Sequence, residues 1–111
     1  MNIRRVRQIL KSFADDTRLR ILSLLDHGDL TVSQMCRILR KNQSNLSKHL
    51  MRLRLTGLVG DRRESLNVYY HLTNPKDPSL KKLLRSVIDS LSGLEIFKQD
   101  VCRLKTLKTK G

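Results

Sequence analysis

Hydrophobic positions recur every three or four residues over most of the chain, which is the spacing of one face of an α-helix. The first such stretch predicts a helix over residues 3–13. A second, largely buried helix follows, because Asp15 and Asp16 can cap its start and the apolar run reaches Leu25 before His27 and Gly28. The apolar positions are Ile3, Val6, Ile9, Leu10 and Phe13, and then Leu19, Ile21, Leu22, Leu24 and Leu25.

Two shorter helices come next, joined by a tight polar turn. Thr31 and Gln34 have the spacing of a capping box, which opens a helix over residues 32–40. Asn42 is the next cap candidate, and the helix behind it covers residues 43–55 and ends near Gly57. The apolar positions are Val32, Met35, Cys36 and Leu39 in the first helix and Leu46, Leu50 and Leu53 in the second. This order predicts a helix-turn-helix.

The rest of the chain predicts a hairpin and at least one further helix. Residues 58–61 and 67–72 are predicted strands, with the charged residues 62–66 at the hairpin tip. Residues 74–78 break the chain, and a strongly amphipathic helix covers 80–91. Leu94, Phe97, Val101 and Leu104 either continue that helix past Ser92-Gly93 or begin another segment. The predicted fold class is mainly α with a small β-hairpin, as a winged helix-turn-helix of about five helices and a two-stranded wing.

Length and composition fit a small binding domain better than an enzyme. The 111 residues, 39% of them hydrophobic, suffice for one domain (1–111) with a modest core but no enclosed substrate cavity. Aromatic residues make up 4% and Trp is absent, which argues against a stacking platform for single-stranded nucleic acid. No apolar run approaches the ~18 residues of a membrane span, and the first residues do not form a secretory signal. We therefore expect a cytoplasmic protein with no membrane partner.

The charge points to a polyanionic partner. The chain has 23 Lys and Arg against 10 Asp and Glu, for a net charge of +13. A basic surface that serves solubility or a ribosome-like role is the alternative. No acidic residue lies between Leu30 and Gly60, where the basic residues are Arg37, Arg40, Lys41, Lys48, Arg52 and Arg54. Two terminal clusters, which ordinary solvated tails would also explain, are Arg4, Arg5, Arg7 and Lys11, and then Arg103, Lys105, Lys108 and Lys110.

The helix over residues 43–55 has a polar face opposite its leucines. At about 100° per residue, this face holds Ser44, Lys48, Met51 and Arg52, with Ser47 on one flank. First-turn capping is an alternative role for Gln43 and Ser44, and a merely solvated face is the alternative for Lys48 and Arg52. His49 lies nearer the leucine stripe, so we interpret it as a packing or polar-edge residue.

Five segments, in this order, resemble the ArsR/SmtB (arsenic-repressor) family of bacterial transcriptional regulators. They are Phe13-Ala-Asp-Asp-Thr-Arg-Leu-Arg-Ile-Leu22, Leu30-Thr-Val-Ser-Gln-Met35, Asn42-Gln-Ser-Asn-Leu-Ser-Lys-His-Leu50, Leu55-Thr-Gly-Leu-Val59 and Val68-Tyr-Tyr-His-Leu72. The resemblance covers roughly residues 8 to 92. It implies a homodimer built from the first and last helices, a recognition helix at about 43–56 and a wing at about 58–72.

The resemblance also implies which residues contact DNA. In the family, the positions of Gln43, Ser44, Ser47 and Lys48 contact DNA, and their chemistry suits bases and phosphates. Arg52 lies on the same face. The hairpin residues Arg62 and Arg63 resemble the family's wing, although the neighbouring Asp61 and Glu64 dilute their charge. The expected partner is double-stranded DNA carrying an inverted-repeat operator, and the expected activity is repression relieved by an effector.

The metal sites usual in the family are not expected here. Thr31 and Ser33 stand where metal-sensing relatives have Cys-x-Cys, and neither replaces a thiolate. The last helix has Asp89, but no His follows His71. We therefore expect no metal and no cofactor.

Two cysteines remain as effector candidates. A subgroup of the family senses reactive sulfur or oxidants through one cysteine in each of two helices, and Cys36 and Cys102 resemble that pair. Cys36 as a small core thiol is one alternative, and an arsenical site centred on Cys102 and shared across the dimer is another.

Other classes of function stay open at this stage. A basic RNA-binding or ribosome-associated module would use the same charge without a palindromic DNA site. A protein-interaction domain is disfavoured by Gln43, Ser44, Ser47 and Lys48 on one face. We do not expect an enzyme, because no nucleophile triad, phosphate loop or carboxylate pair appears.

Overall fold

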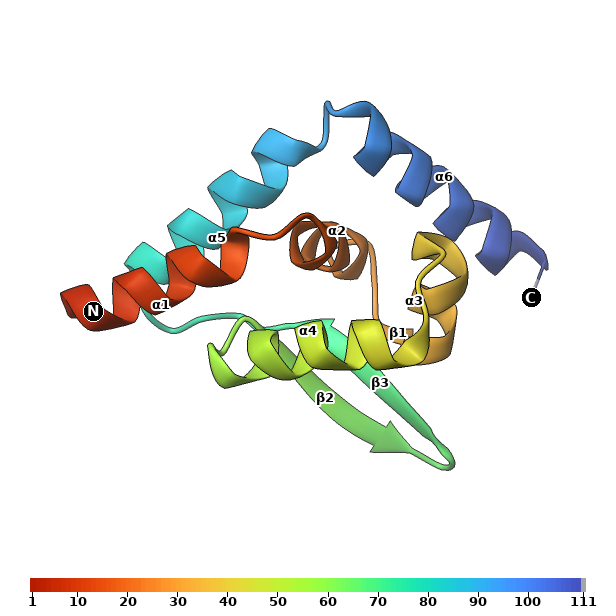
Figure 1. The fold of residues 1–111 in the computed structure, drawn as a ribbon, viewed down its shortest axis with the longest axis horizontal. Coiled ribbons are helices and arrows are strands. Elements are labelled where there is room, and N and C mark those ends of the chain that lie inside the picture. Colours follow the sequence, from red (N-terminus) through yellow and green to blue (C-terminus); the bar gives the residue numbers. More distant parts are fainter. Residues whose placement is uncertain (111) are drawn as a thin grey trace.

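The computed structural model describes residues 1–110, which form six α-helices and a three-stranded sheet (Figure 1). The helices are α1 (Ile3–Phe13), α2 (Asp16–Leu25), α3 (Val32–Leu39), α4 (Gln43–Leu55), α5 (Pro78–Leu91) and α6 (Glu95–Lys110). The strands are β1 (Leu30–Thr31), β2 (Val59–Glu64) and β3 (Asn67–Leu72). Gly111 of the predicted domain and the side chain of Lys110 from the C-terminal basic cluster lie outside the described part.

Side-chain caps fix the starts of the helices as the sequence predicts. The Asn42 carboxamide oxygen accepts from the backbone N–H of Asn45 at 2.8 Å and so begins α4. Thr31 and Gln34 form both hydrogen bonds of the capping box at the start of α3, at 3.2 and 2.9 Å. The capping box begins α3, and the Asn42 cap begins α4 directly after the short turn at residues 40–42, so the predicted helix-turn-helix is confirmed.

The sheet has one strand more than predicted. β3 lies in the centre, with β1 and β2 antiparallel on either side of it. Leu30 and Thr31 of β1 pair with Tyr70 and Tyr69. A two-residue strand has no periodicity of its own, so only its pairing with β3 defines it. The prediction has the two strands of the wing, β2 and β3, and lacks β1.

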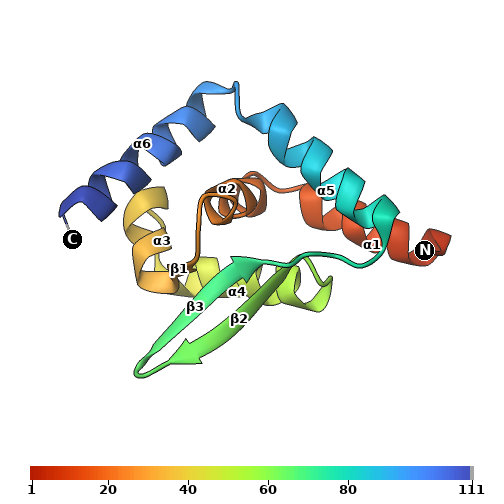
Figure 2. The same cartoon turned by 180° about the vertical axis from the view of Figure 1, so that it is seen from behind.

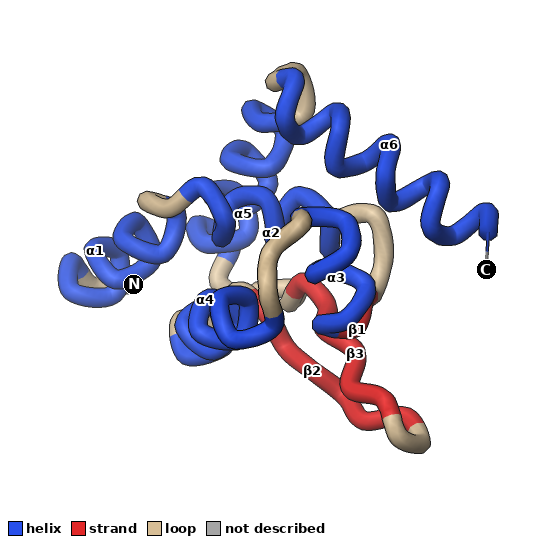
Figure 3. Tube along the Cα trace, turned by 45° about the vertical axis from the view of Figure 1, so that its right-hand side comes forward, coloured by secondary structure: helices blue, strands red, loops and turns tan. Residues whose placement is uncertain are grey.

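The hairpin is longer than predicted and its turn is tighter. β2 runs to Glu64, so Ser65 and Leu66 alone form the turn, with Ser65 at a φ of +58°. Arg62 and Arg63 therefore lie within a strand, paired with Tyr69 and Val68, and not at the tip. The hairpin projects beyond the helices (Figure 3). Cross-strand pairing decides this boundary, because the charged sequence of β2 has no strand signal.

The C-terminal segment forms a sixth helix. α5 ends at Leu91, and after Ser92 and Gly93 the chain reverses into α6. α5 and α6 diverge from this turn and straddle α2 (Figures 1 and 2). Phe97 and Leu104 of α6 are buried, and α6 packs on α2 and α3. The residues after Ser92 and Gly93 therefore begin a separate helix and do not continue α5. The chain has six helices within residues 1–110, and the predicted number of about five is corrected.

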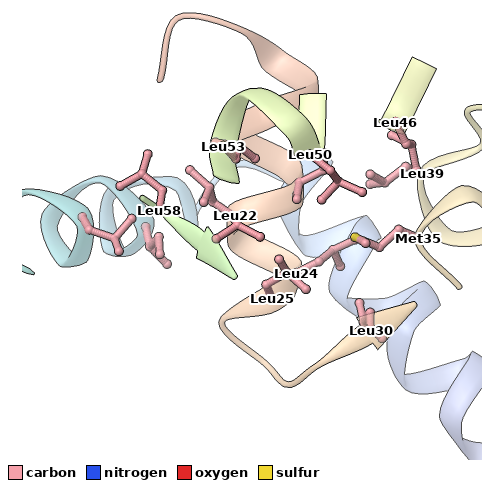
Figure 4. Packing of buried hydrophobic residues seen from close by; sticks show 14 of the residues in the cluster. Leu22, Leu24, Leu25, Leu30, Met35, Leu39, Leu46, Leu50, Leu53 and Leu58 are labelled. Carbon is pink, nitrogen blue, oxygen red and sulfur yellow. The ribbon is translucent and has the colours of Figure 1, made fainter. Parts of the chain in front are cut away.

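The core forms around α2. Leu22 and Leu24 of this helix are fully buried and lie among side chains of α3 and α4 (Figure 4). Leu46, Leu50 and Leu53 of α4 point into this cluster, each at most 1% exposed. Burying side chains of this size contributes about 1.5–3 kcal/mol each. The inward stripe of α4 is thereby fixed, which turns its polar face outward.

Candidate nucleic-acid interface

Five polar side chains of α4 are exposed and have no polar partner among the described residues. Within residues 1–110, none of them makes a side-chain hydrogen bond or an ion pair, and all are exposed. They are Gln43, Ser44, Ser47, Lys48 and Arg52. Asn42 provides the cap of α4, so Gln43 and Ser44 are not needed for that role. All five predicted residues of this helix are thus exposed in the structure.

His49 ties α4 to the start of α2. Its Nδ1 lies 3.2 Å from Nη1 of Arg18 and 3.8 Å from a carboxylate oxygen of Asp15. Burial lowers the pKa of His49, and the nearby cations Arg18, Lys41 and Lys48 act in the same direction against Asp15. A neutral ring can accept the hydrogen bond from Arg18. His49 is therefore a polar-edge residue, as predicted.

Arg18 is a residue that the sequence does not single out. Its guanidinium also donates to the carbonyl oxygens of Ser12 and Lys11, at 2.8 and 3.1 Å. One side chain therefore joins the end of α1, the start of α2 and the middle of α4. No local pattern reveals this role, because its three acceptors come together only in the folded chain.

The two arginines of the wing are in different environments. Arg62 pairs with Asp29 and Glu64, and its guanidinium carbon lies 5.1 Å from the Tyr69 ring centroid. Arg63 is exposed and, among residues 1–110, makes no ion pair. Arg63 therefore offers a free cation to an anionic partner, whereas the charge of Arg62 is already matched. Asp29 is a second residue that the sequence does not single out.

The cysteines lie on adjacent helices as free thiols. Cys36 of α3 is partly buried against the core, and this burial raises the pKa of its thiol. Cys102 of α6 is exposed and borders a cavity of about 270 Å³, together with Arg37 of α3 and Arg40 directly after that helix. α3 and α6, which carry the two thiols, pack on one another.

Within residues 1–110, no three His, Cys, Asp or Glu side chains come close enough to hold a metal ion together. Thr31, at one of the positions where metal-sensing relatives have cysteine, caps α3.

Comparisons with known proteins match this architecture. The family described as "Bacterial regulatory protein, arsR family" matches residues 15–60. The transcriptional activator HlyU of Vibrio cholerae is 38% identical over 76 residues, which cover 68% of this chain and 70% of HlyU. The transcriptional repressor PagR of Bacillus anthracis is 39% identical over 82 residues, 72% of this chain and 81% of PagR. The chain belongs to the ArsR family.

Solved structures agree with this assignment. A structure of HlyU from Vibrio cholerae has a TM-score of 0.67 and 32% identity, and covers 78% of this chain and 94% of that chain. A homodimeric winged helix-turn-helix DNA-binding domain from Mycobacterium bovis has a TM-score of 0.67 and 30% identity, and covers 84% of this chain and 87% of that chain. This ArsR-family protein is a DNA-binding transcription regulator with a winged helix-turn-helix. None of the helices within residues 1–110 is long and apolar enough to span a membrane.

Proposed function

We propose that this ArsR-family regulator is a repressor that binds an inverted-repeat operator in double-stranded DNA as a homodimer. The observation that carries the proposal is the set of exposed polar side chains of α4 that make no side-chain hydrogen bond or ion pair within residues 1–110. A recognition helix contacts base edges with its N-terminal residues in the major groove. Gln43 would then contact a base, Ser44 and Ser47 bases or phosphates, and Lys48 and Arg52 guanine or phosphates.

The dimer predicted from the sequence uses the first and last helices, and the predicted last helix divides into α5 and α6. The proposed dimer uses α1 and α5. Ile3 and Leu10 of α1 are 78% and 51% exposed, and with Val6 they border an apolar cavity of about 440 Å³. On α5, Leu83 and Val87 are only half-buried. A second copy would cover this apolar surface, which a monomer leaves in water. Two symmetric copies would place their recognition helices roughly 34 Å apart, one turn of DNA.

The proposed effector is an oxidant or reactive sulfur that links Cys36 to Cys102. With peroxide, the two thiols lose two protons and two electrons, a disulfide forms, and the peroxide is reduced to water. The link would pull α3 toward α6 and misalign α4 on its site. A loss of ~3–4 kcal/mol in binding would release the operator roughly a hundred- to thousand-fold.

Selection from a randomised DNA pool, followed by a promoter reporter and sedimentation, tests the proposal. We expect an inverted repeat, a dimer, and a reporter that rises when the regulator is deleted. Equal affinity for structured RNA and the selected duplex, or a monomer at micromolar concentration, would contradict it. For the effector, Cys36→Ser and Cys102→Ser should each stay bound under peroxide, and release of either variant like the parent protein excludes the thiol switch.

A further inference from the structure

A basic groove lies beside the recognition helix, between α1 and α4. Its volume is about 600 Å³, and Gln8 and Lys11 of α1 border it opposite Lys48 and Arg52 of α4. Arg18 and His49 also line it. Within the described residues, no acidic side chain borders this groove. The groove therefore joins cations from two helices that are far apart in the sequence.

The structure holds α1 firmly against the end of α4. Nη2 of Arg5 donates to the carbonyl oxygen of Thr56 at 2.5 Å, and the hydroxyls of Ser12 and Thr56 lie 3.3 Å apart. α1 passes beside the C-terminal end of α4 in both ribbon views (Figures 1 and 2). Arg18 binds the carbonyl oxygen of Lys11. The backbone that carries Lys11 is thus fixed by long-range bonds.

Three of the cations bordering the groove are free to bind an anion. The side chains of Lys11, Lys48 and Arg52 are exposed and, in the part of the chain described, make no ion pair or hydrogen bond. Arg18 differs, because three acceptors already occupy its guanidinium. Lys48 and Arg52 are one helical turn apart, so the groove is continuous with the outer face of α4.

We infer that this groove binds the DNA backbone, so that Lys11 contacts a phosphate flanking the major groove that α4 enters. The inference rests on the proposed function. A polyanion relieves the repulsion among the unpaired cations, and the backbone borders the major groove that a recognition helix enters. Met51 and Leu55, 65% and 79% exposed, border the same groove and suit the apolar edges of deoxyribose.

The test is the salt dependence of binding to a mixed-sequence duplex, because phosphate contacts do not depend on sequence. Lys11→Gln should reduce the slope of log Kobs against log[NaCl] by about 0.9 per protomer bound. Gln8→Lys adds a cation to the same groove and should steepen the slope by a similar amount. Lys105→Gln on α6 removes an equal charge elsewhere and should leave the slope unchanged.

For each variant, circular dichroism checks the folding and sedimentation checks the oligomeric state. If the wild-type protein binds the duplex but both Lys11→Gln and Gln8→Lys leave the salt slope unchanged, this inference is wrong and the proposed function is not affected. The inference is also wrong if a variant changes the oligomeric state and leaves the salt slope unchanged, because the groove is then a contact between copies of the chain. A wild-type protein that does not bind the duplex overturns the proposed function and this inference together.

Discussion

Arg20 and Asp100, 80 residues apart in the sequence, form a two-point ion pair that fixes α6 to α2. Nε and Nη2 of Arg20 each lie 2.8 Å from a carboxylate oxygen of Asp100. The Asp100 side chain is 1% exposed, and that of Arg20 is 12% exposed. The hydrogen bonds that Arg20 donates to Asp100 raise the pKa of Arg20 against the effect of burial. α6 is therefore held by a charged contact as well as by its apolar residues.

Replacing Asp100 should destabilise the protein strongly. Asp100→Asn removes the carboxylate that pairs with the partly buried Arg20 guanidinium, and breaking such a pair costs about 3–5 kcal/mol. Urea unfolding measures the change. Glu95→Gln, at an exposed position of the same helix, is the control and should change stability by less than about 1 kcal/mol. Equal effects of the two substitutions would mean that the pair does not stabilise α6.

The residues of α4 should differ in what they contribute to DNA binding. Gln43→Ala should cost about 1–3 kcal/mol on the selected operator and blur discrimination at one base pair. Lys48→Ala should weaken binding to all sequences and flatten the salt dependence. Titrations of operator and scrambled duplexes measure both effects, with Gln99→Ala on α6 as control. If neither substitution changes operator affinity at low salt, α4 is not the recognition helix.

Asp29 should restrain the contribution of Arg62 to DNA binding. Asp29→Asn removes one of the two carboxylates paired with Arg62, so affinity for a mixed-sequence duplex should rise and its salt slope steepen by up to about 0.9. Glu95→Gln makes the same change in net charge away from the wing and serves as control. Arg63→Ala should weaken binding more than Arg62→Ala does. If Asp29→Asn and Glu95→Gln change the affinity for the duplex equally, the net charge of the protein explains the effect and the pairing of Asp29 with Arg62 does not.

The two thiols should react at different rates. Thiolate is the nucleophile, and the pKa of Cys36 is raised by burial, whereas Cys102 is exposed. Limiting iodoacetamide should therefore modify Cys102 well before Cys36, as measured by mass spectrometry of peptides at successive times. In denaturant, this difference in modification rate between Cys102 and Cys36 should disappear. Faster modification of Cys36 in the folded protein would contradict the exposure of these side chains.

The protein should lose stability when His49 is protonated. Burial lowers the pKa of His49 in the folded state, so below its unfolded value of about 6.5 the unfolded chain binds more protons. Stability from this residue is present above about pH 6.5 and falls as the pH drops toward the folded pKa. Unfolding at two pH values across this window should therefore show a smaller loss for His49→Gln than for the wild type. His27→Gln at an exposed position is the control, and an equal loss in all three proteins refutes the prediction.

The sequence by itself determined the helix-turn-helix and the face of α4 that points outward. Caps such as Asn42 and the leucines at Leu46, Leu50 and Leu53 act over three or four residues, so the chain carries them locally. The polar residues that alternate with these leucines must then face outward. The order of helices and hairpin followed for the same reason.

The contacts between distant segments are defined only in the folded chain. β1 forms because Leu30 pairs with Tyr70 of β3. Arg62 is matched by Asp29, and Lys11 lies beside α4 because α1 packs on Thr56. Each contact joins residues more than 30 positions apart, as does the Arg20–Asp100 pair. No short-range periodicity encodes such pairs, because their free energy is gained only when the shared core around α2 has brought the segments together.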